Sequence, residues 1–89
     1  MQLSNLVGKH VFVRTVTNYY TGRLNEPEPG SGFLSLGDAA WIADTGRFAD
    51  ALAKGTLNEI EPYPEGVLVA IGSIVDICEW GHDLPRKQR

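Results

Sequence analysis

The chain has 89 residues, of which 43% are hydrophobic, and its formal net charge is −3 at pH 7. This length suits one small domain, and the hydrophobic share is too high for a wholly disordered chain. An acidic protein repels nucleic-acid phosphates, which excludes broad electrostatic binding of DNA or RNA. Any nucleic-acid role must therefore depend on a local site or on the end of the chain.

That end is basic. Of the eight Lys and Arg residues, three lie in the last four positions, at Arg86, Lys87 and Arg89. We therefore divide the chain into a domain at 1–85 and a basic C-terminal tail at 86–89. A free, solubilising end is the favoured interpretation of this tail, and a contact to nucleic acid is the alternative.

Membrane insertion and disulfide bonding both lack support in the sequence. No apolar run approaches the roughly 20 residues of a membrane span, and residues 1–5 lack the basic and apolar regions of a signal peptide. Cys78 is the single cysteine, so no internal disulfide can form. We expect a cytoplasmic protein without a membrane partner.

The chain begins with a short helical pattern followed by a strand. Apolar residues recur at helical spacing at Leu3, Leu6 and Val7, and a glycine follows, which favours one or two turns of helix. The next stretch, at 9–17, is rich in β-branched residues and predicts the first strand.

Two more strands follow, separated by a loop. Residues 19–24 predict the returning strand of a hairpin, and Gly22 inside it marks a sharp bend or bulge. Prolines and glycines make 26–32 a loop. Residues 33–43 then predict a third strand that is long enough to curve.

The second half of the chain predicts a short helix and two short strands. Asp44 or Thr45 can cap a short helix that ends at Gly55. This helix carries Phe48, Ala51 and Leu52 on one face. Apolar strands follow at 67–71 and 74–80, with a tight break at Gly72 and the serine after it.

The predicted fold is mainly β. A short N-terminal helix precedes five strands, and a small sheet that bends strongly at glycines curls into a partly open barrel. The last two strands are short and apolar and carry few charges that would guard an open edge. We therefore expect the segment 67–80 to pair with a neighbouring subunit.

This order of elements resembles the Sm-like family, whose members form rings by pairing the fourth strand of one subunit with the fifth strand of the next. Val11-x-Val13 followed by Gly22-x-Leu24 resembles the first family motif. The run 33–39 resembles its third strand, and the run 69–75 resembles its second motif, in which a glycine turn separates two apolar strands.

More distinctive stretches are similar to small Sm-like proteins encoded by bacteriophages, namely 38–42, 45–48 and 61–64. The resemblance implies an Sm-like barrel and a homo-oligomeric ring of about five to seven copies. The residues expected to lie in the subunit-pairing strands are Val67, Val69, Ile71, Gly72, Ile74 and Ile77.

The departures from the family fall where RNA would be recognised. In RNA-binding relatives, the loop after the second strand supplies an acid and an asparagine, whereas here Phe33 stands near the asparagine position and Glu26 only loosely replaces the acid. Ile71 occupies the place of an arginine. Loss of that cation removes a phosphate partner and a flat surface for base stacking.

Cations and flat rings in or near the strands are the candidate contacts to nucleic acid or another ligand. Aromatic rings can stack on bases, but they also favour strands, so a core or subunit contact is the competing interpretation. The candidates are Arg14, Tyr19, Arg23, Trp41 and Arg47.

Asp76 is unusual because it lies in a strand among apolar neighbours. It either pairs with Arg14 or Arg23 across a subunit boundary, or it faces water.

The sequence offers no set of residues suited to binding a metal or to nucleophilic catalysis. Cys78 and His82 are four positions apart, with Glu79 between them and His10 elsewhere, but structural zinc needs four closely paired ligands. A lone cysteine in an apolar strand behaves as a small hydrophobe, and nothing nearby would activate its thiol. We therefore expect no metal, no cofactor and no enzymatic activity.

Together these features predict a non-enzymatic Sm-like protein that forms a homo-oligomeric ring. We expect it to act as a phage-related scaffold or accessory factor. The alternative is an RNA-binding chaperone that resembles the bacterial host factor.

Overall fold

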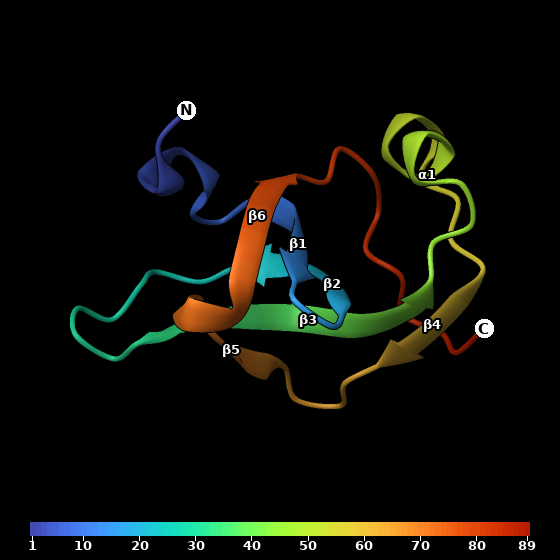
Figure 1. Cartoon of the computed structure of the whole chain (residues 1–89). Coiled ribbons are helices and arrows are strands. Elements are labelled where there is room, and N and C mark those ends of the chain that lie inside the picture. The colour runs from blue at the N-terminus through green and yellow to red at the C-terminus, as the bar shows by residue number, and fades with distance from the viewer.

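A bent antiparallel sheet of six strands forms the body of the protein (Figure 1). The computed structural model describes residues 1–89. The strands are β1 (His10–Thr15), β2 (Tyr19–Leu24), β3 (Phe33–Asp44), β4 (Glu59–Pro62), β5 (Val67–Ala70) and β6 (Ile74–Glu79). The helical elements are α1 (Phe48–Lys54) and two 3-10 turns at Leu3–Leu6 and Ile71–Ser73. The expectation of a mainly β protein is confirmed.

Two details of the predicted fold differ from the structure. The sheet has six strands and not five, because the 12-residue β3 is too long for the four-residue β5 to cover, and β4 pairs with its second half. The expected N-terminal helix is a 3-10 turn of four residues. Gly8, with φ of 81°, turns the chain away soon after it.

β5 and β6 are not neighbours in the pairing order of the sheet. The sheet runs β4-β3-β2-β1-β6, and β5 pairs with the first half of β3 at Phe33–Leu36. Every pairing in the sheet is antiparallel. β5 and β6 are neighbours in sequence, joined by the 3-10 turn, yet three strands separate them across the sheet.

The sheet bends where β2 crosses β3. A Cβ at Gly22 would lie 2.9 Å from the Cβ of Leu36, so only glycine allows this close approach. The pairing register shifts between Thr21 and Arg23. In β3, Asp38 adopts a positive φ of 46° between the halves that pair with β5 and β4.

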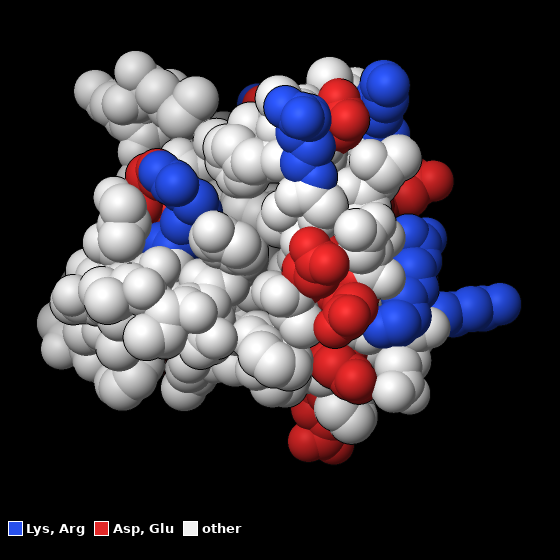
Figure 2. Space-filling model, turned by 45° about the vertical axis from the view of Figure 1, so that its right-hand side comes forward, with Lys and Arg blue, Asp and Glu red and all other residues white.

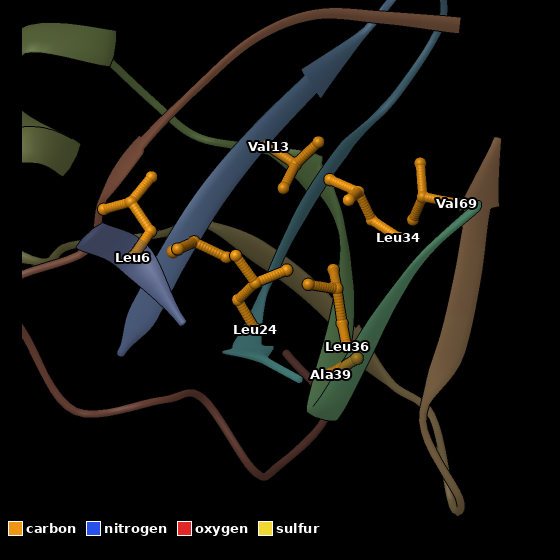
Figure 3. Close-up of a cluster of buried hydrophobic side chains, with 8 residues drawn as sticks. Leu6, Val13, Leu24, Leu34, Leu36, Ala39 and Val69 are labelled. Atoms are coloured by element: carbon orange, nitrogen blue, oxygen red, sulfur yellow. The ribbon is translucent and has the colours of Figure 1, made fainter. Parts of the chain in front are cut away.

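Successive side chains alternate between the two faces of a strand, and each face of this sheet carries its own apolar cluster. The first cluster, here called the inner core, is held within the bend (Figure 3). Its buried members are Leu6, Val11, Val13, Leu24, Leu34, Leu36, Ala39 and Val69.

The second cluster, here called the outer core, includes residues from α1 and from the segment that joins β3 to β4. Its buried members are Phe12, Ala40, Ile42, Ala51, Leu57, Ile60, Trp80 and Leu84. Ala51 comes from α1 and Leu84 from the segment after β6, so these two elements cover one face of the sheet. A small sheet thereby buries both of its faces.

The C-terminal residues run past α1 and end beside β4 (Figure 1). Ile60 and Arg89 exchange two backbone hydrogen bonds, with N···O distances of 3.1 and 2.9 Å. Arg86 Nη1 lies 3.2 Å from Asp38 Oδ1, and Gln88 Nε2 donates to Glu61 Oε1 at 3.1 Å. The segment interpreted from sequence as a free end is therefore hydrogen-bonded to β4 at Ile60.

The one α-helix in the structure has seven residues, and no helix is long and apolar enough to cross a membrane.

Candidate functional site

Two strand edges of the sheet have no partner within the chain. β5 pairs only with β3, and β6 pairs only with β1, so each strand leaves its other row of backbone groups open. Neither strand is deeply buried. Val69 is the single buried residue of β5, and β6 has none.

Large apolar side chains lie exposed along these edges. The exposed fraction is 63% for Leu68 on β5 and 59% for Val75 on β6. Ile71, in the 3-10 turn between the two strands, is 49% exposed. Each open edge therefore carries an exposed apolar side chain that a partner strand would cover.

The six residues expected in the subunit-pairing strands divide into two groups. Val69 belongs to the inner core, and Val67, Ile74 and Ile77 pack against it. Ile71 and Gly72 are exposed in the 3-10 turn. The apolar residues with the greatest exposure on the strands themselves are Leu68 and Val75, which the sequence did not single out.

Arg14 and Tyr19 lie directly opposite each other on β1 and β2 and therefore share a face of the sheet. The Arg14 guanidinium lies 5.4 Å from the ring centroid of Phe48, the first residue of α1. Arg14 Nε also donates to both carboxylate oxygens of Asp76, at 2.9 and 3.0 Å. Asp76 thus has its partner on the neighbouring strand of the same chain.

The other three candidate contacts lie elsewhere. Trp41 pairs across the sheet with Tyr20, and therefore projects from the opposite face to Tyr19. Arg23 Nη1 donates to Asp38 Oδ2 at 2.7 Å. Arg47 precedes α1 and is exposed. The five residues chosen from the sequence therefore do not converge on one surface.

The two aspartates that pair with arginines carry lowered pKa values. The hydrogen bond from Arg14 lowers the pKa of Asp76, and the hydrogen bond from Arg23 lowers that of Asp38. Arg86, from the C-terminal segment, lowers the pKa of Asp38 further through its charge. The pair of Arg14 with Asp76 joins β1 to β6. Asp38 of β3 is joined to β2 through Arg23 and to the C-terminal segment through Arg86.

Cys78 is half-buried beside Phe12, and burial raises the pKa of its thiol. Such a thiol is a poor nucleophile because its reactive thiolate is disfavoured. The histidines contact backbone carbonyls. His10 Nδ1 lies 2.8 Å from the carbonyl of His82, and His82 Nε2 lies 2.7 Å from that of Leu52. No group of three metal-ligating side chains is found in the structure.

A cavity of about 1000 Å³ lies between the end of α1 and the C-terminal segment. Its basic lining residues are Lys54, Arg86, Lys87 and Arg89, and its one acidic lining residue is Asp83. The basic end of the chain is evident from the sequence, but nothing in the sequence places it against α1. Lys54 lies at the end of α1, directly before Gly55, and a lysine in that position does not by itself indicate a binding site.

No family model matches the chain, and no curated protein matches it. The Sm-like resemblance therefore stays a prediction drawn from the motifs around Gly22 and Gly72.

Proposed function

We propose that this protein is a non-enzymatic, Sm-like scaffold or accessory factor, of the type found in phages, that assembles into a closed ring. β5 of one copy would pair with β6 of the next. The observation that carries the proposal is the pair of open strand edges at separate ends of one bent sheet.

The contact would be heterologous, because two different edges meet. Such a contact can repeat from copy to copy, and it closes into a ring when the rotation between copies divides a full turn. A bent sheet with one open edge at β5 and another at β6 can supply both halves of this contact.

Burial and charge also favour pairing between copies. Ring formation would cover Leu68 and Val75, which are exposed in the single chain. β5 carries no charged residue that would repel another strand, although β6 carries Asp76 and Glu79. Natural edge strands that stay unpaired are usually protected by charges, prolines or bulges. β5 contains neither a charged residue nor a proline.

The test is native mass spectrometry at about 10 µM protein, a concentration at which a ring interface of ordinary affinity is assembled. We expect one discrete mass at a whole-number multiple of the chain. Replacing both exposed residues, as Leu68→Lys with Val75→Lys, should give a folded monomer, because lysines at the edges oppose strand pairing. Circular dichroism checks that the variant is folded.

Leu52→Lys is the matched control. Leu52 is also partly exposed and apolar, but it lies on α1, away from both edges. This variant should keep the wild-type mass. A wild-type monomer, or a double variant that keeps its oligomeric mass, would contradict β5–β6 pairing. A broad series of masses would indicate open filaments and would contradict a closed ring.

A further inference from the structure

The distribution of ion pairs sets the cavity beside α1 apart from the rest of the surface. Four of the eight Lys and Arg residues have a carboxylate partner within 4.0 Å, namely Lys9, Arg14, Arg23 and Arg86. The four without such a partner are Arg47, Lys54, Lys87 and Arg89. Three of these four line the cavity. In a protein whose net charge is negative, most of the uncompensated positive charge is therefore collected at one cavity.

The charged surface around the C-terminal segment is not uniformly basic. Figure 2 shows basic side chains on the right of the view beside a column of acidic ones. Glu61 of β4 is one nearby acid, and it accepts a hydrogen bond from Gln88. None of the acids comes within 4.0 Å of the charged nitrogens of Lys54, Lys87 or Arg89, so those cations are available to a ligand.

The walls of the cavity are fixed by contacts within the chain. On one side, His82 Nε2 lies 2.7 Å from the carbonyl of Leu52, which ties the C-terminal segment to α1. Gly55 permits this approach, because a Cβ there would lie 2.7 Å from Cγ of His82. On the other side, Arg89 Nη1 donates to the carbonyl of Leu57 at 3.1 Å. Walls held in this way reduce the ordering cost of binding a ligand.

The chemistry of the lining favours a phosphate group with an organic body attached. An arginine and two lysines suit a group that carries two negative charges, since guanidinium and ammonium donors form strong charge-assisted bonds to phosphate oxygens. The volume of about 1000 Å³ exceeds the needs of a free phosphate ion. Four outer-core residues lie beneath the wall, each at most 5% exposed, so polar side chains would supply most of the contact to an organic body: Leu57, Ile60, Trp80 and Leu84.

We propose that this cavity binds a phosphomonoester, namely a small phosphorylated molecule of about nucleotide size. The proposal is independent of ring assembly, because no lining residue belongs to β5 or β6. A ring that binds no phosphomonoester would reject only this inference, and a monomer that binds one would reject only the ring.

Isothermal titration calorimetry on the full chain at about 50 mM salt tests the proposal, with AMP, inorganic phosphate and a six-residue oligouridylate as probes. We expect AMP to bind once per chain and more tightly than phosphate. Changing both lysines, as Lys54→Gln with Lys87→Gln, should weaken AMP binding by about tenfold or more, because two charge-assisted contacts are lost.

Two controls separate a site from diffuse charge. Lys9→Gln with Arg47→Gln also removes two positive charges, but outside the cavity, and should change the AMP affinity by less than about twofold. The pair Lys54→Arg with Lys87→Arg keeps both charges and should retain AMP binding. Thermal melting of each variant checks that it is folded.

Three results would overturn the proposal. The first is that no AMP binding is detected. The second is that the glutamine variants at Lys54 and Lys87 bind AMP as tightly as the wild type. The third is that the oligouridylate binds while AMP does not, which would assign the cavity to a nucleic-acid strand.

Discussion

Gly22 and Gly72 carry the two motifs of the Sm-like resemblance, but their physical roles differ. At Gly22 a Cβ would press within 2.9 Å of Leu36 Cβ and 3.1 Å of the carbonyl oxygen of Gly37. At Gly72 a Cβ would meet nothing within 4 Å, and no positive φ requires a glycine there. Close approach of β2 to β3 therefore depends on the first glycine, whereas the 3-10 turn tolerates a side chain at the second.

We therefore expect opposite outcomes from the same substitution. Gly22→Ala should lower the free energy of unfolding by about 1–3 kcal/mol, because the added methyl overpacks the crossing of β2 and β3. Gly72→Ala should be neutral or stabilising by up to about 1 kcal/mol, because alanine restricts the unfolded chain. Urea denaturation measures both. Equal losses in the two variants would show that the contact with Leu36 does not set the glycine requirement.

The pairing of Arg14 with Asp76 makes stability depend on pH. The pKa of Asp76 is lowered in the folded state, so the folded protein binds a proton there less readily than the unfolded chain does. The contribution to stability is fully present above the unfolded pKa of about 3.9 and is lost as the pH falls through the lower folded pKa.

Asp76→Asn removes this carboxyl, so the variant should lose less stability than the wild type as the pH falls from about 5 to about 2. Urea midpoints at a series of pH values provide the comparison. Glu65→Gln is the control, since Glu65 is exposed and forms no ion pair. If the pH profiles of Asp76→Asn and Glu65→Gln coincide, the ion pair contributes nothing measurable.

At the scale of elements, the structure assigns a role to the segment between β3 and β4. α1 and the residues after it add Ala51, Leu57 and Ile60 to the outer core. Leu57 is 5% exposed, whereas Leu52 on α1 is 36% exposed. The segment between β3 and β4 therefore covers one face of the sheet, and its buried residues contribute to the stability of the fold.

Truncating the two leucines tests this cover. Leu57→Ala should lower the free energy of unfolding by about 2–5 kcal/mol, through lost burial and the cavity that remains. Leu52→Ala removes the same atoms from a partly exposed side chain and should cost well under half as much. Chemical denaturation with two-state analysis gives both values. Similar losses at the two positions would mean that Leu57 is not packed in the outer core.

Element prediction succeeded where the signal was local. The β-branched run 9–17 predicted β1, and the glycine in the second strand predicted the bend. It failed where pairing was decided by distant residues. β4 exists because its four residues meet the second half of β3, and nothing in the segment 59–62 alone marks it as a strand.

At the scale of the whole molecule, the chain leaves two kinds of surface without a partner. The open edges of β5 and β6 carry exposed apolar side chains, and the cavity beside α1 carries cations without carboxylate partners. The two surfaces are built from different segments. Ring assembly is therefore tested at Leu68 and Val75, and ligand binding is tested at Lys54 and Lys87.

The candidate site was only partly accessible from sequence. The segment 67–80 was predicted to pair with a neighbouring subunit because its apolar strands carry few charges, and this stays a prediction. The five candidate contacts were chosen as cations and flat rings in or near the strands: Arg14, Tyr19, Arg23, Trp41 and Arg47. The structure places Arg14 and Tyr19 on one face of the sheet and Trp41 on the other, and Arg47 lies before α1. Residue type identifies what a side chain can bind, but the sheet register decides which side chains share a face.

The sequence by itself determined that this is a small, mainly β protein with a bend at Gly22 and a break at Gly72, because strand propensity and glycine geometry act over a few residues. Only the tertiary structure decided that Arg89 lies beside Ile60, that Asp76 pairs with Arg14, and that Lys54 shares a cavity with Lys87. Each of these contacts joins residues more than 25 positions apart, and such contacts depend on how the whole sheet closes around its two cores.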